Sequence, residues 1–147
     1  MIATPHGMPV AWCLASPKIG EPGVAAALLA HARRNHALRP GLILIGDKGF
    51  AGHEFEQLVT ASFRLSLVRP DRRDEVPRHD SIGWIRQWIE SVNDTLKGQL
   101  DLERHGGRTT AGIYTRIAQR LLAMAAAIWH NWATSTPTKR SLISYDN

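Results

Sequence analysis

The chain has 147 residues, of which 44% are hydrophobic and 21% are charged, and its formal net charge is +5. This composition excludes an intrinsically disordered class and predicts one globular domain. The single cysteine excludes an intramolecular disulfide framework. The sequence has no uncharged apolar run of about 18 residues, which a membrane span would need, and its N-terminus lacks the basic region and hydrophobic core of a signal peptide. We therefore expect a soluble, cytoplasmic protein with no membrane partner, whose basic surface suits a polyanion.

The first predicted elements are two short strands, over residues 1–5 and 10–15, joined by a turn. A helix is predicted from Pro22 to Arg34, because proline is favoured at the first position of a helix and residues 24–30 are all apolar. Glu21 lies at the start of that helix, where the helix dipole stabilises a carboxylate. We expect Glu21 to be a helix-start carboxylate of this kind and not a ligand at a sheet edge.

An unbroken apolar run, Leu42–Ile45, predicts the next strand, and its composition indicates burial on both faces. Gly46 and Gly49 mark the end of this strand. Asp47 therefore lies at the carboxyl end of a strand, which is where open α/β sheets bind their ligands.

Beyond Asp47, the spacing predicts a short helix over 53–62 and an alternating strand over 63–68, followed by a charged, proline-containing loop over 69–80. The last helix is predicted from Thr110 to Trp132, and the chain loses its periodicity after Thr134. Strands and helices thus alternate, as in an α/β sheet with helices on its faces. We expect residues 135–147 to be a disordered tail.

A helix before residue 100 carries a second carboxylate. Its apolar positions are spaced by three and four: Ile82, Ile85, Ile89, Val92 and Leu96. Arg86, Glu90 and Lys97 fall on one stripe beside that apolar face. Two carboxylates on separate elements, flanked by Arg and Lys, can hold divalent cations and balance the charge of a phosphodiester. The alternative is that Asp47 caps a turn and that Arg86 and Glu90 form a helical ion pair.

These residues resemble a known family. The sequence Gly46-Asp47-Lys48-Gly49-Phe50 resembles the motif around the second acidic residue of the DDE transposases of bacterial insertion sequences. The pattern Arg86-x3-Glu90-x6-Lys97 resembles the signature around their third acidic residue. That signature also has a Tyr three residues before the Arg, whereas this chain has Gly83 there. The opening strands are similar to the second and third strands of the family, so the resemblance covers nearly the whole chain.

The resemblance implies an RNase H-like mixed sheet flanked by helices, with residues 1–134 as a partial catalytic domain. In the family the first catalytic Asp lies on the first strand. Residues 1–46 contain no Asp, and their single Glu is Glu21. We therefore expect an N-terminally truncated domain in which the first strand and the first catalytic Asp are absent. That strand would lie between the opening strand and the Leu42–Ile45 strand.

The function implied by the resemblance is DNA cleavage and strand transfer by two-metal phosphoryl transfer. Asp47 and Glu90 would bind Mg²⁺ or Mn²⁺, and the chain would be inactive alone. Five basic residues would contact the transposon ends or target DNA: Arg69, Arg72, Arg73, Arg86 and Lys97. Two alternatives stay open, a DNA-binding remnant without catalysis and one half of a split nuclease or transposase. The partner would be a second copy in a homodimer, or an upstream polypeptide that supplies the missing strand.

Overall fold

A computed structural model describes residues 1–76, 83–137 and 142 of the chain. The chain forms two compact units, one made of Met1 and Val10–Gly83 and the other of Ile2–Pro9 and Trp84–Asn147. Each unit contains fully buried apolar side chains. The order of elements confirms the predicted alternation of strands and helices.

Strand β1 (Ile2–Ala3) pairs with β2 (Pro9–Ala11) across a tight turn. The turn is closed by two backbone hydrogen bonds: Thr4 N–H donates to the Met8 carbonyl at 2.9 Å, and Gly7 N–H donates to the Thr4 carbonyl at 2.8 Å. Gly7 has a φ of 88°, a conformation that glycine adopts without steric cost. The predicted strand pair is confirmed, although both strands are shorter than expected.

In the first unit, α1 (Glu21–Arg34) precedes β3 (Ile43–Ile45), and α2 (His53–Gln57) continues into a wider turn, Leu58–Ser62, before β4 (Ser66–Val68). Strands β3 and β4 are parallel, with Leu44 opposite Leu67. The connection between them contains a helix, as parallel pairing requires. The parallel pair and its connecting helix confirm the predicted α/β class. The RNase H-like arrangement of the sheet stays a prediction.

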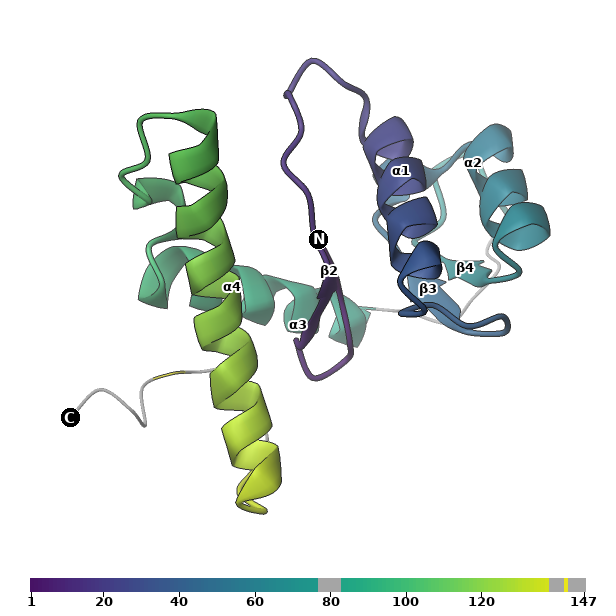
Figure 1. Ribbon diagram of the computed structural model, residues 1–147. Helices are drawn as coiled ribbons and strands as arrows, with labels where there is room; N and C mark the ends of the chain where they lie inside the picture. Colours follow the sequence, from purple (N-terminus) through teal and green to yellow (C-terminus); the bar gives the residue numbers. More distant parts are fainter. Residues whose placement is uncertain (77–82, 138–141, 143–147) are drawn as a thin grey trace. The chain divides into compact units, whose positions relative to one another are not determined.

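The expectation that the Leu42–Ile45 strand is buried on both faces is wrong for this structure. Ile43 is 65% exposed and Leu42 is 46% exposed. Among the described residues, β4 is the one strand paired with β3, and α1 and α2 lie on the same side of the two strands (Figure 1). A continuous apolar run thus predicted the strand correctly but overestimated how much of it is covered.

The second unit is built on α3 (Gly83–Asp94), which continues into Thr95–Gln99, and on α4 (Thr110–Ala133). Thr109 caps α4 by accepting a hydrogen bond from Gly112 N–H at 3.1 Å. The chain approaches α4 so closely at Gly107 that a Cβ there would lie 2.7 Å from the Ile113 nitrogen. This glycine is therefore required for the entry into α4. Five apolar side chains are buried in this unit, together with the polar Thr95 and Asn131: Val92, Leu96, Leu121, Met124 and Ile128.

The predicted last helix is confirmed within one residue of its end. Thr136 N–H donates to the Asn131 carbonyl at 2.9 Å, and Ser135 has a φ of 55°, so the backbone turns away from the helix axis here. Residues 138–141 and 143–147 of the predicted tail lie outside the described residues, and its disorder stays a prediction. No helix in the described part of the chain is long and apolar enough to cross a membrane.

Candidate functional site

Asp47 lies just beyond the carboxyl end of β3, and its side chain is exposed. Gly46 N–H donates to the Val68 carbonyl at 3.0 Å, which extends the ladder of the parallel pair by one bond. A Cβ at Gly46 would lie 3.1 Å from the ring of Phe50, so glycine allows this ring to fold back over the strand end. The turn Lys48–Phe50 follows at once, and its Phe50 N–H donates to the Asp47 carbonyl. The Asp47 carboxylate makes no capping hydrogen bond in this turn.

Glu21 lies beside the same turn. Its Oε2 atom would be 3.3 Å from a Cβ placed on Gly49, two residues after Asp47. The sequence predicts Glu21 as a carboxylate at the start of α1, and it does occupy the first turn of that helix. Its approach to the Asp47 turn was not predictable from the sequence, since it depends on how α1 packs against residues 48–50.

Arg69 comes directly after β4 and is 5% exposed. Its Nε–H donates to Glu56 Oε1 at 2.8 Å, and an Nη2–H donates to the same oxygen. The two Nη atoms also donate to the two oxygens of Glu75, at 2.7 and 2.8 Å, and Nη1 donates to the Pro70 carbonyl at 3.1 Å. All five N–H groups of the guanidinium thus have protein partners.

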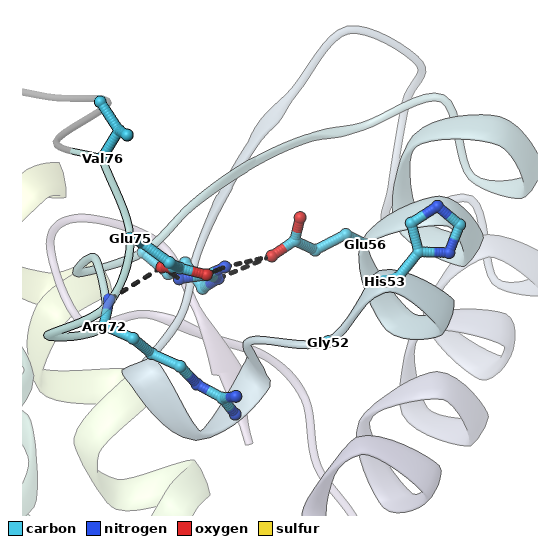
Figure 2. A pocket seen from close by; sticks show the side chains of 7 residues that line it. Gly52, His53, Glu56, Arg72, Glu75 and Val76 are labelled. Atoms are coloured by element: carbon cyan, nitrogen blue, oxygen red, sulfur yellow. Dashed lines mark hydrogen bonds and ion pairs between the residues drawn. The ribbon is translucent and has the colours of Figure 1, made fainter.

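Hydrogen bonding to Glu75 raises the pKa of Arg69 above its ordinary value, and Glu56 adds to this rise, while burial opposes it. Arg69 therefore stays cationic and joins α2 to the segment that follows β4. Dashed lines in Figure 2 mark the interactions made by the carboxylates of Glu56 and Glu75 in this cluster. Sequence reasoning placed Arg69 among the DNA contacts, but its donors are used inside the unit, so we leave it out of the set proposed to bind phosphate.

A hollow of about 470 Å³ lies over this cluster, lined by Gly52, His53, Glu56, Arg69, Arg72, Glu75 and Val76. The Arg72 Nη2–H donates to the Ala51 carbonyl at 2.7 Å, and its backbone N–H donates to Glu75 Oε2 at 2.8 Å. The His53 ring points away from the two carboxylates (Figure 2). Arg72 and Arg73 are both exposed. They are the predicted loop cations whose side chains face solvent in this unit.

The second unit carries the other predicted residues. Glu90 lies on α3 and is exposed. The backbone of Arg86 belongs to α3, but its side chain lies outside the described part of the structure. Lys97 Nζ lies 2.8 Å from Glu103 Oε1, and both side chains are well exposed. This ion pair joins the end of the α3 segment to the short turn Leu102–Arg104.

The ion pair between Lys97 and Glu103 shifts the pKa of both side chains. The hydrogen bond to Glu103 raises the pKa of Lys97, and the same bond lowers the pKa of Glu103. The contribution of Glu103 to stability is therefore present above its unfolded-state pKa and is lost as pH falls through the lower folded-state pKa. The contribution of Lys97 is present below its own unfolded-state pKa and is lost as pH rises through the higher folded-state pKa.

Lys97→Ala is expected to move the pKa of Glu103 back up toward its ordinary value, because the hydrogen bond and the attraction are removed together. Carbon-detected NMR titration of the Glu103 carboxylate measures this shift. Lys97→Arg, which keeps the charge, is the matched control and should leave the pKa low. An identical Glu103 titration in Lys97→Ala and in the wild type would contradict the ion pair.

The two predicted metal ligands belong to different units, Asp47 to the first and Glu90 to the second. Within the described ranges, no three His, Cys, Asp or Glu side chains gather as they do around a metal ion. Each unit thus presents one exposed carboxylate from the predicted set, and in each unit exposed basic residues accompany it.

No protein-family model, curated protein or solved structure matches the chain. Its functional class is therefore inferred from its own residues and their geometry.

Proposed function

We propose that this chain is part of the RNase H-like catalytic domain of a DDE transposase of the insertion-sequence type, and that Asp47 and Glu90 are ligands for Mg²⁺ or Mn²⁺. The position of Asp47 is the observation that carries this proposal. Its carboxylate projects into solvent just past the carboxyl end of a parallel strand, where α/β sheets place ligands. The predicted motif around Glu90 supplies the second carboxylate, on an exposed helical position.

Asp47 and Glu90 provide part of the ligand set that Mg²⁺ or Mn²⁺ would need. Carboxylate oxygens are ligands that Mg²⁺ and Mn²⁺ prefer, and Asp47 makes no capping bond that would compete. Asp47 and Glu90 together provide two carboxylates, which is fewer than the three that the resemblance implies for a two-metal site. We therefore propose that a partner polypeptide supplies a further carboxylate, and we expect weak cation binding and little strand transfer from this chain alone.

In the assembled site, bound cations would supply the activation of the attacking oxygen and the stabilisation of the leaving oxygen. Within this chain, Asp47 and Glu90 are the residues that would hold the cations. Arg72, Arg73 and Lys97 are exposed, and their positive charge would attract the flanking phosphates. Arg86 is included through its place in the motif. The net charge of +5 favours association with DNA.

The test is Mn²⁺ binding, followed by paramagnetic broadening of backbone amide signals. We expect broadening centred on Gly46–Gly49, with a dissociation constant on the order of 10⁻³ M. Asp47→Asn should remove this broadening because it removes the anionic ligand. Asp74→Asn, at another exposed acidic position of the same unit, is the matched control and should keep it. Broadening that persists unchanged in Asp47→Asn would rule out Asp47 as a ligand.

A non-catalytic DNA-binding role is the second candidate, favoured by the exposure of Arg72 and Arg73 and by the separation of the two carboxylates into different units. The two candidates differ in how cations affect DNA binding. In the transposase proposal, Mg²⁺ strengthens DNA binding through Asp47, and Asp47→Asn abolishes this effect. In the second candidate, binding depends on salt alone, and Asp47→Asn leaves it unchanged.

A further inference from the structure

The solvent-facing side of α4 carries large apolar side chains along much of its length. Leu122 is 69% exposed, Trp129 is 59% exposed and Trp132 is 71% exposed. The other positions of the same series along the helix hold small, uncharged residues. This face, which we call the α4 stripe, alternates spacings of four and three: Ala111, Thr115, Ala118, Leu122, Ala125, Trp129 and Trp132. Such spacing is the pattern by which one helix packs along another.

Charge is absent from the stripe. At about 100° per residue, its members lie within roughly 80° of Leu122 around the helix. Arg116 and Arg120, the two arginines of α4, lie roughly 120° and 160° away. The core side chains Met124 and Ile128 face the interior of the unit and are not part of the stripe. The stripe is thus a second apolar face on α4, distinct from the one that the second unit buries.

We propose that the α4 stripe is a dimer interface that binds the same stripe of a second copy of this chain, with the two helices antiparallel. The alternation of large and small side chains along the stripe is the reason for choosing a second copy as the partner. When two copies are placed antiparallel about a two-fold axis between residues 123 and 124, each large side chain faces a small one. Leu122 faces Ala125, Trp129 faces Ala118, Trp132 faces Thr115 and, at the edge, Tyr114 faces Ala133.

A self-complementary surface is what a two-fold symmetric dimer requires. The pairing also brings no arginine of one copy into the seam of the other. In antiparallel helix pairs, the first heptad position of one helix packs against the fourth heptad position of the other. The residues of the stripe are spaced alternately by four and three, so they occupy these two heptad positions. A second copy therefore fits the stripe in both size and charge.

The available area is sufficient for a modest dimer. Tyr114, Trp129 and Trp132 are 50%, 59% and 71% exposed. With about 150–250 Å² for each aromatic side chain, their exposed parts come to roughly 270–450 Å² per chain. Specific interfaces bury about 500 Å² or more per partner. Leu122 and the alanines of the stripe supply the remainder along a helix roughly 36 Å long.

Sedimentation equilibrium of the full chain over a range of concentrations tests the proposal. We expect a reversible monomer–dimer equilibrium. Leu122→Glu should raise the dissociation constant by about tenfold or more, because it places a charge in the apolar seam. Ala123→Glu, which adds the same charge at the next exposed position and off the stripe, should leave the dimer intact. A monomer at every concentration, or equal effects of the two substitutions, would overturn the interface.

A size exchange tests the register. Ala118→Trp should prevent dimerisation, because it opposes Trp129 of the other copy, and Trp129→Ala should weaken dimerisation by leaving a gap. The double variant Ala118→Trp with Trp129→Ala restores one large and one small side chain at the contact and should recover the dimer. Circular dichroism confirms that each variant keeps its helical content. A folded double variant that stays monomeric would overturn the antiparallel register.

Discussion

Replacing Arg69 by alanine is expected to lower the free energy of unfolding of the first unit by about 3 kcal/mol. The substitution leaves Glu56 and Glu75 facing each other without the cation that joins them, and it removes five hydrogen bonds at once. We take the lower end of the range for a broken buried pair, because the two carboxylates keep 29% and 27% of their side-chain surface in contact with solvent.

Amide hydrogen exchange at Val59 and Leu65 measures this loss, because both residues lie in the core of the first unit. Arg73→Ala is the control, since an exposed arginine of the same segment should change stability by no more than about 0.5 kcal/mol. Arg69→Lys keeps the charge but has three donors on one nitrogen, so an intermediate loss is expected.

The effect of Arg69→Ala should also depend on pH. Without the guanidinium, the carboxylates of Glu56 and Glu75 repel each other, and protonation of either one relieves the repulsion. The difference in stability between the wild type and Arg69→Ala should therefore narrow as pH falls below about 4, near the ordinary pKa of Glu. Equal exchange rates in Arg69→Ala and Arg73→Ala at neutral pH would show that the cluster contributes little to stability.

Met124→Ala is expected to destabilise the second unit by about 2–5 kcal/mol. Met124 is 0% exposed and lies on the face of α4 that also buries Leu121 and Ile128, where α4 packs on the Thr95–Gln99 segment. Deleting its side chain removes apolar contacts and leaves a cavity that the neighbouring side chains fill incompletely. Chemical denaturation, with exchange at the Leu121 and Ile128 amides as the local measure, gives the size of the effect.

Met124→Leu is the matched control for this cavity. It conserves most of the volume and should cost less than about 1.5 kcal/mol. A loss in Met124→Ala as small as that in Met124→Leu would mean that the core around α4 is loosely packed and collapses around the missing side chain.

The helices were the most predictable part of this chain, because their signals are local. Pro22 lies in the first turn of α1, Thr109 caps α4, and the apolar residues of α4 follow a spacing of three and four. The position of Asp47 was equally local, since the apolar run before it and the flanking glycines mark the strand end. These features need no information about distant residues.

Contacts between distant segments were not predictable in the same way. Arg69 lies in a stretch whose sequence indicates a solvated loop, yet 13 residues separate it from Glu56, and α2 brings the two together. The exposure of Ile43 was missed for a similar reason. An apolar strand has the same sequence whether a neighbouring strand or helix covers it or not.

The sequence by itself determined the order of strands and helices, the strand-end position of Asp47 and the exposed helical position of Glu90, because side-chain periodicity, proline, glycine and capping residues act over a few neighbours. Tertiary packing makes Arg69 a buried clamp and brings Glu21 close to the Asp47 turn, and among the described residues it leaves Leu122, Trp129 and Trp132 of α4 exposed. Burial and ion pairing depend on which segments meet in space, and that is set by the packing of the whole unit.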